Sequence, residues 1–187
     1  MIEKSLIFLK DRINAYLKLK TGEDNKINLT NLTDDNGKTI IKDLGFSLVN
    51  VEEERIFKNQ NPPVKNIDGS YSTVNPEVNL NLYVIVTANF GDKETDYRES
   101  LKFLSYVVTF FQARNVFNPQ NSPELDPRIT KLTVELQNIS FEAQNNLWAS
   151  LGAKYMPSVL YKLRMITIQE MEIKSEAPPV TEANLYD

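Results

Sequence analysis

One stretch, from Leu132 to Ile168, constrains the fold more than any other part of the chain. Apolar and polar residues alternate from Leu132 to Gln137, and alternate again after Pro157, which is the period of a strand with one buried face. Between these runs, Ser140 offers a helix N-cap and Gly152 a left-handed C-terminal cap. The stretch therefore predicts a strand, a short helix and a second strand. The expected apolar stripe of this helix is Phe141, Leu147, Trp148 and Leu151.

Two longer helices are expected, over residues 2–19 and 93–115. In the first, Ile2, Leu6, Leu9, Ile13 and Leu17 recur at helical spacing. The second carries two neighbouring apolar stripes, one through Tyr97, Leu101, Leu104, Val108 and Phe111, the other through Phe103, Val107 and Phe110. Together they are wider than a helix on a single sheet face requires. Either this helix is wedged between the sheet and the first helix, or the Phe103 edge lies at a subunit interface.

The remaining patterns predict strands at Phe46–Arg55 and Leu80–Phe90, with a weaker one at Lys26–Leu32. Residues 57–76 lack periodicity and read as a long surface loop. The expected fold is α+β, a mixed, mainly antiparallel sheet of about four or five strands with the two long helices on one face. We expect a single domain over residues 1–173 and a flexible tail over 174–187, because the tail has two prolines and few apolar residues.

The composition argues against most kinds of catalytic, metal-binding and phosphate-binding site. Histidine and cysteine are absent and only six glycines occur, so the commonest general base, the commonest metal ligands and a phosphate-cradling loop are missing or poorly supported. We expect no catalytic residues, no cofactor and no metal. The net charge of −4 without a basic run argues against nucleic acid or an anionic membrane as partner. The charged first segment and the lack of a long apolar run indicate a cytosolic protein.

Several residues are candidates for contact with other subunits, each with a plainer interpretation beside it. Three glutamates end the strand before Arg55; they are either a solvated strand end or partners for basic groups on an adjoining subunit. Trp148 either anchors its helix in the core or forms a binding corner with Lys154 and Tyr155, since Trp and Tyr are frequent in interface hot spots. The candidates are Glu52, Glu53, Glu54, Arg55, Phe103, Trp148, Lys154, Tyr155, Leu185 and Tyr186.

Several long segments together resemble one protein family. They are LVNVEEER (Leu48–Arg55), LNLYVIVTANF (Leu80–Phe90), YRESLKFLSYVVTFFQARNVF (Tyr97–Phe117), SPELDP (Ser122–Pro127) and NNLWASLGAKYMPSVLYKLRMITI (Asn145–Ile168). In order and over nearly the whole chain, they resemble the cap, or tail-terminator, proteins of bacterial contractile injection systems, which are phage-tail-like particles with a contractile sheath around an inner tube.

The resemblance implies a structural protein and not an enzyme. It implies a homo-oligomeric ring, a hexamer, at the end of the particle away from the baseplate, where it ends polymerisation of tube and sheath and joins the two. Assembly in the cytoplasm, within a particle that can be released, is also implied, as is the choice between a minimal cap and an adaptor to another cap protein. Two alternatives from the residues alone stay open: a small peptide-binding adaptor module with an open sheet edge, and an enzyme using carboxylates alone.

Overall fold

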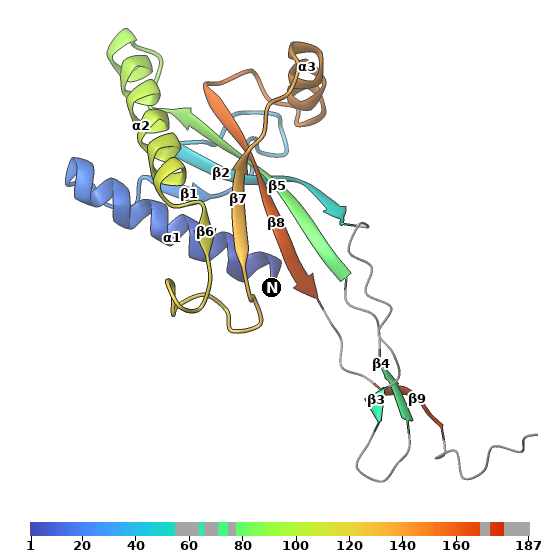
Figure 1. The fold of residues 1–187 in the computed structure, drawn as a ribbon. Helices are drawn as coiled ribbons and strands as arrows, with labels where there is room; N and C mark the ends of the chain where they lie inside the picture. The colour runs from blue at the N-terminus through green and yellow to red at the C-terminus, as the bar shows by residue number, and fades with distance from the viewer. Residues whose placement is uncertain (55–63, 66–70, 75–77, 169–172, 178–187) are drawn as a thin grey trace, which may run out of the picture.

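The structure is a computed structural model that describes residues 1–54, 64–65, 71–74, 78–168 and 173–177. It confirms the predicted α+β class, with helices packed on a mixed, mainly antiparallel sheet (Figure 1). No helix among the described residues is long and apolar enough to span a bilayer.

The main sheet has six strands in the order β1-β2-β5-β8-β7-β6. Only the β1–β2 pair is parallel, and the four other pairs are antiparallel. The sheet is larger than expected because it includes β6, whose two residues are too few for periodicity to reveal. β1, with three residues, lies within the weaker strand predicted at Lys26–Leu32. The members of the sheet are β1 (Ile27–Leu29), β2 (Asp43–Glu53), β5 (Val78–Asn89), β6 (Val116–Phe117), β7 (Leu132–Leu136) and β8 (Ser158–Ile168).

Helices α1 (Ile2–Thr21) and α2 (Glu94–Ala113) lie on the same face of this sheet (Figure 1), as predicted. Their fully buried side chains, such as Ile13 and Phe103, pack with Leu82 of the central strand β5 in one hydrophobic core. Helix α1 ends at Gly22, whose φ of 78° suits a residue without a side chain. The burial of these apolar stripes places the larger core between the two long helices and the sheet.

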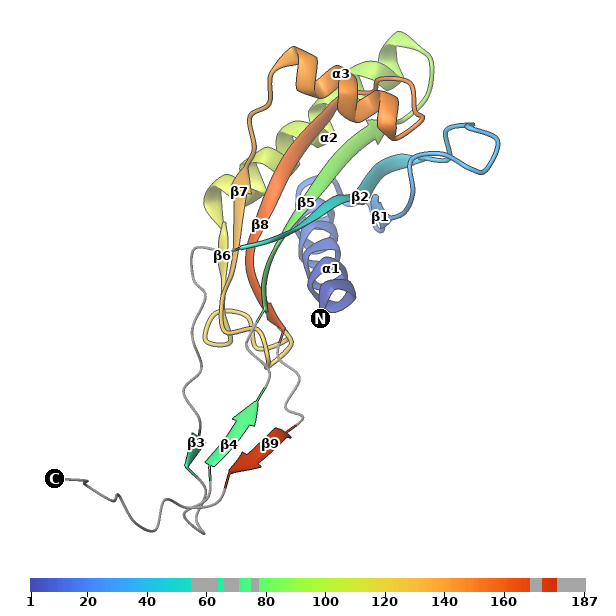
Figure 2. The ribbon, with the colours of Figure 1, turned by 90° about the vertical axis from the view of Figure 1, so that its right-hand side faces the viewer.

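The short helix α3 (Phe141–Ser150) covers part of the opposite face, near one end of the strands (Figure 2). Its N-cap is the predicted one, since the Ser140 hydroxyl oxygen accepts a hydrogen bond from the Ala143 N–H at 3.2 Å. The apolar stripe was predicted wrongly at one residue: Phe141 is 91% exposed, because it precedes the turn of the helix that meets the sheet. A second core forms here from Leu32, Ile41, Ile85, Trp148 and Met156.

A three-stranded sheet is formed by β3 (Val64–Lys65), β4 (Tyr71–Val74) and β9 (Ile173–Ala177), with β4 antiparallel to both others. The expectation of a structureless loop over residues 57–76 was therefore wrong for β3 and β4. The tail predicted from residue 174 likewise begins inside β9. β3 has only two residues, and β4 pairs with β9 from a distant part of the chain, Tyr71 with Ala177 for example, so no local pattern indicates these strands. Residues 178–187 lie outside the described residues.

Candidate interaction surfaces

Beyond the second core, the same face of the main sheet becomes polar. Strand register places Tyr83 of β5, Lys162 of β8 and Glu135 of β7 in one row across the sheet. Asn81 and Glu52 are opposite one another on the neighbouring strands β5 and β2. We call the residues Glu52, Glu54, Asn81, Tyr83, Glu135, Lys162 and Arg164 the polar sheet face.

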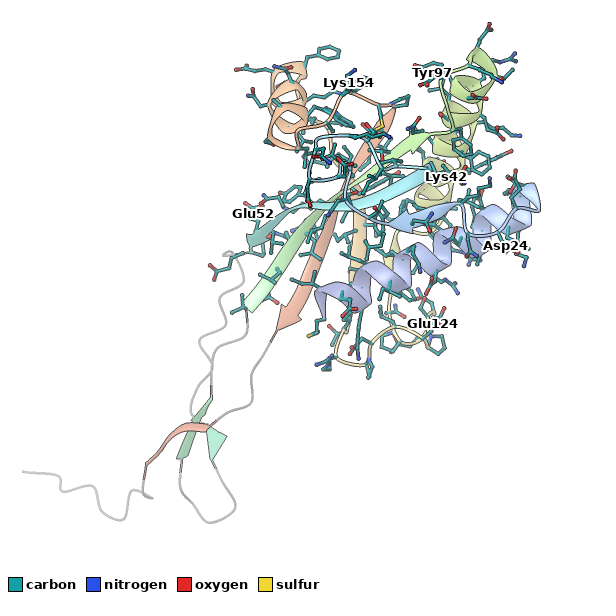
Figure 3. The ribbon with its side chains drawn as sticks, turned by 180° about the vertical axis from the view of Figure 1, so that it is seen from behind. Asp24, Lys42, Glu52, Tyr97, Glu124 and Lys154 are labelled. Atoms are coloured by element: carbon teal, nitrogen blue, oxygen red, sulfur yellow. The ribbon has the colours of Figure 1, made fainter. Side chains whose placement is uncertain are left out.

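Glu52 is held at one edge of the polar sheet face by Tyr83. The Tyr83 hydroxyl donates a hydrogen bond of 2.7 Å to the Glu52 carboxylate, and the Lys162 ammonium lies 5.4 Å from the centre of the Tyr83 ring. The hydrogen bond to the carboxylate raises the pKa of Tyr83, and burial raises it further. Glu52 itself is exposed at the end of β2 (Figure 3). The surface at this point therefore combines the negative charge of Glu52 with the positive charge of Lys162, both held at Tyr83.

Glu54 lies deeper, in a network that reaches across to β7. Its carboxylate accepts a hydrogen bond of 3.0 Å from the Asn81 amide and is 3.7 Å from the Arg164 guanidinium. Arg164 also contacts the Glu135 carboxylate at 3.4 Å. Glu54 is only 9% exposed, so it belongs to this internal network and is not available to an adjoining subunit. Glu53 is exposed, and strand alternation separates it from Glu52 and Glu54. The three carboxylates do not converge.

The predicted Trp148 corner divides into a buried and an exposed part. Trp148 is 5% exposed and belongs to the second core, as its core interpretation predicts. Tyr155, which is 63% exposed, packs edge-on against the Trp148 ring with centroids 5.5 Å apart. Lys154 is exposed beside it (Figure 3). Only Lys154 and Tyr155 are thus accessible to another protein at this corner.

Phe103 has no exposed surface and stacks against Phe90, with ring centroids 4.7 Å apart. The sequence left its role open, and the structure favours the core interpretation, so its proposed exposure at an interface is corrected. The accessible apolar edge of α2 is instead the other stripe, in which Tyr97, Leu101 and Val108 are 52%, 44% and 36% exposed. The sequence analysis did not identify this edge as an exposed surface. The combined width of the two apolar stripes, greater than one sheet face requires, was the signal that could have found it.

The remaining candidates Arg55, Leu185 and Tyr186 lie outside the described residues. Across the part of the chain that the structure describes, no group of three or more acidic, histidine or cysteine side chains is arranged to hold a metal ion. The described surfaces combine mixed charges on the sheet with the exposed Lys154–Tyr155 corner and an exposed apolar edge on α2.

A comparison with models of protein families matches residues 7–182 to the Pvc16 N-terminal domain. A search of proteins with curated descriptions finds no match.

Two solved structures share the fold. One is the sheath/tube terminator of an extracellular contractile injection system, PVC, in its extended state, with a TM-score of 0.59, 16% identity and 97% of this chain covered. The other is the tube-terminating cap of the anti-feeding prophage, with a TM-score of 0.54, 14% identity and 96% of this chain covered. The chain spans 62% and 60% of the length of these two proteins.

Proposed function

Because the chain belongs to the family of Pvc16 N-terminal domains, we propose that it caps a contractile injection particle at the end away from the baseplate. The family match over residues 7–182 is the observation that carries this proposal. Two proteins of the same fold are described as a sheath/tube terminator and a tube-terminating cap. The capping role consists of ending polymerisation of the tube and the sheath and joining the one to the other.

The proposed assembly is a homo-oligomeric ring, a hexamer, with tube and sheath subunits as its partners. The role is structural and involves no catalysis. We place its assembly in the cytoplasm, within a particle that is later released. The surfaces that support such contacts are the polar sheet face, the exposed Lys154–Tyr155 corner and the apolar edge of α2. Mixed charges at fixed positions favour register and partner choice more than affinity.

Particle length tests the proposal. Tube and sheath subunits assembled with the purified chain should give particles of defined length with a ring at one end in negative-stain images. Without the chain they should polymerise to a broad range of lengths. If the added chain is absent from particle ends and the length distribution is unchanged, the capping proposal is wrong.

A charge-matched pair of variants tests the polar sheet face. Glu52→Lys reverses the charge at its edge, whereas Asp35→Lys makes the same change in an exposed turn before β2. We expect Glu52→Lys to weaken ring formation or attachment to the particle end, and Asp35→Lys to have little effect. Equal loss from both would indicate a dependence on net charge alone.

A further inference from the structure

A groove of about 420 Å³ lies between the C-terminal half of α2 and strand β7. Val108 and Gln112 line it on the helix side, Leu136 on the strand side, and Tyr161 of β8 also lines it. Val108 and Leu136 are 36% and 54% exposed. The groove therefore continues the exposed apolar edge of α2 onto the outer edge of the sheet.

Tyr161 gives this groove an unused polar group. Its side chain is 2% exposed and packs against Phe111, with ring centroids 4.7 Å apart. Its hydroxyl has no hydrogen-bond partner among the described residues. Buried hydroxyls are nearly always paired, because burial without a partner forfeits their hydrogen bonds to water. A ligand acceptor in the groove would supply the missing partner.

Strand β7 also presents an open backbone edge at the groove. The Gln137 N–H donates to the Leu160 carbonyl at 2.8 Å, and in the same antiparallel register Glu135 is opposite Lys162. Alternation then turns the backbone groups of Leu136 away from β8. On that outer side, β6 pairs only as far as Thr133, and the Val134 N–H donates to the Asn115 carbonyl at 2.8 Å. Within the described chain, no strand lies beside Leu136.

The groove carries almost no charge. Helix α2 has no charged residue from Phe103 to Ala113, and the side chain of Glu135, the charged residue lining the groove, reaches Arg164 at 3.4 Å. An open strand edge beside an apolar groove is the arrangement that binds an extended peptide by strand addition. The missing charge favours an uncharged segment, since a charged side chain would lose hydration without gaining a partner.

We propose that residues 178–187 of a second copy bind at β7, with Ala183–Tyr186 as the added strand and Leu185 in the groove. Pro178 and Pro179 cannot continue the backbone pairing of β9, and Ala183–Tyr186 forms an uncharged run beyond them. A backbone carbonyl of this segment would accept from the Tyr161 hydroxyl. Donor segment and receiving groove are different surfaces, so the contact is head-to-tail, the kind that forms a ring when the rotation between copies closes. The second copy is supplied by the proposed ring, and in this respect the inference rests on the proposed function.

The test measures binding of a fluorescently labelled peptide, residues 178–187, to the full-length chain by anisotropy. We expect saturable binding that is lost when Leu185 of the peptide is replaced by Asp. Tyr161→Phe should weaken binding by about tenfold, the equivalent of one hydrogen bond. The same variant should melt at an equal or higher temperature, because it removes a buried hydroxyl without a partner. A purely structural role for Tyr161 predicts no loss of binding.

A matched pair on α2 locates the site. Val108→Glu places a charge in the groove, whereas Thr109→Glu places one on the neighbouring exposed position. Binding should be lost in the first variant and retained in the second. Absence of binding to the wild-type chain, or equal binding by both variants, would overturn the proposal.

Amide hydrogen exchange at Leu136 in the dilute monomer separates the second copy from the same copy. Protection without added peptide would mean that the tail occupies its own groove, which also contradicts the proposal. Rings that form although the peptide does not bind would leave the capping function intact and reject only this inference. Peptide binding by a chain that forms no rings would support this inference and contradict the proposed ring.

Discussion

Trp148 shows how one side chain connects α3 to the sheet. At 5% exposure it packs with Ile85 of β5 and with Leu32 and Ile41 from the segment before β2. Trp148→Ala should lower the free energy of unfolding by about 3–5 kcal/mol, since truncation leaves a cavity in that core. Phe141→Ala is the control in the same helix, because Phe141 is 91% exposed and should change stability by less than about 0.5 kcal/mol. Denaturant unfolding measures both, and similar small losses would contradict the assignment.

Asp126 makes stability depend on pH in acid. Its carboxylate accepts hydrogen bonds from the Arg128 side chain at 2.9 and 3.0 Å and from the Arg128 N–H at 3.0 Å, and lies 3.2 Å from Lys4 of α1. The Arg128 side chain, its backbone N–H and Lys4 together hold the pKa of Asp126 well below its usual range. The folded state therefore favours the ionised carboxylate, and this stabilisation is present above the unfolded pKa of about 4 and lost as pH falls further.

The corresponding variant is Asp126→Asn, which keeps an acceptor oxygen but cannot ionise. We expect it to be less stable than the wild-type chain at pH 7, with the difference shrinking steadily below about pH 4. Urea midpoints measured from pH 7 to pH 2.5 test this. A difference that stays constant over that range would mean that the charge of Asp126 contributes nothing.

Between elements, Gly45 sets how closely the segment before β2 approaches the sheet. A Cβ at this position would overlap Ile41 Cδ1 and lie 2.7 Å from Thr87 Oγ1. Gly45→Ala should therefore lower the free energy of unfolding by about 1–3 kcal/mol. Adding Ile41→Val removes the overlapping methyl group and should recover part of the loss, a coupling that a double-mutant cycle measures. Purely additive effects would show that the overlap is relieved elsewhere.

The predictability of the elements follows their length and the range of their contacts. Helices α1 and α2, with 20 residues each, and the long strands show their buried faces as local periodicity, so their positions were predictable. The order β5-β8-β7 joins parts of the chain in a way that no period specifies. β6 was missed because it has only two residues, and β4 and β9 because they are short and pair with each other from distant parts of the chain. Burial of Phe103 rather than Leu101 depends on how α2 is rotated against β5, and both residues belong to apolar stripes.

For the interaction surfaces, the sequence was informative about residue types and less so about their exposure. Trp148 is buried, in agreement with its core interpretation, whereas Glu52 and Tyr155 are exposed, which leaves both of their interpretations open. The α2–β7 groove combines Val108, Leu136 and Tyr161 from three elements. Its components are ordinary core-type residues, and only the register of β6 and β7 shows that an edge remains open beside them.

For the whole molecule, we expect stability to be independent of small ligands. The chain has no histidine or cysteine, and its described residues hold no metal-binding cluster. A ligand that binds the native state raises its melting temperature, so ATP with Mg²⁺, or a chelator, should leave that temperature unchanged in a thermal-shift experiment. A reproducible upward shift with ATP or Mg²⁺, or a loss on chelation, would reveal a site that this expectation excludes.

The tail should contribute to assembly and hardly to folding. Truncation after Ala177 keeps β9 and its pairing with β4, and removes a segment with two prolines and few apolar residues. We expect its urea midpoint to equal that of the full chain within error, because so polar a segment buries little surface. Ring formation and attachment to particle ends should weaken, since a tail that orders only on binding stabilises only the assembled state.

Truncation after Ile173 is the contrasting variant, because it also removes most of β9 and leaves β4 without that partner. Any change in unfolding that appears only in this shorter chain therefore reports on the three-stranded sheet and not on the tail. Negative-stain counts of rings and of capped particle ends, made at equal protein concentration for both truncations, complete the comparison. A lower midpoint for truncation after Ala177 would place the tail within the folded domain. Normal rings and particle lengths from that chain would show that assembly does not need residues 178–187.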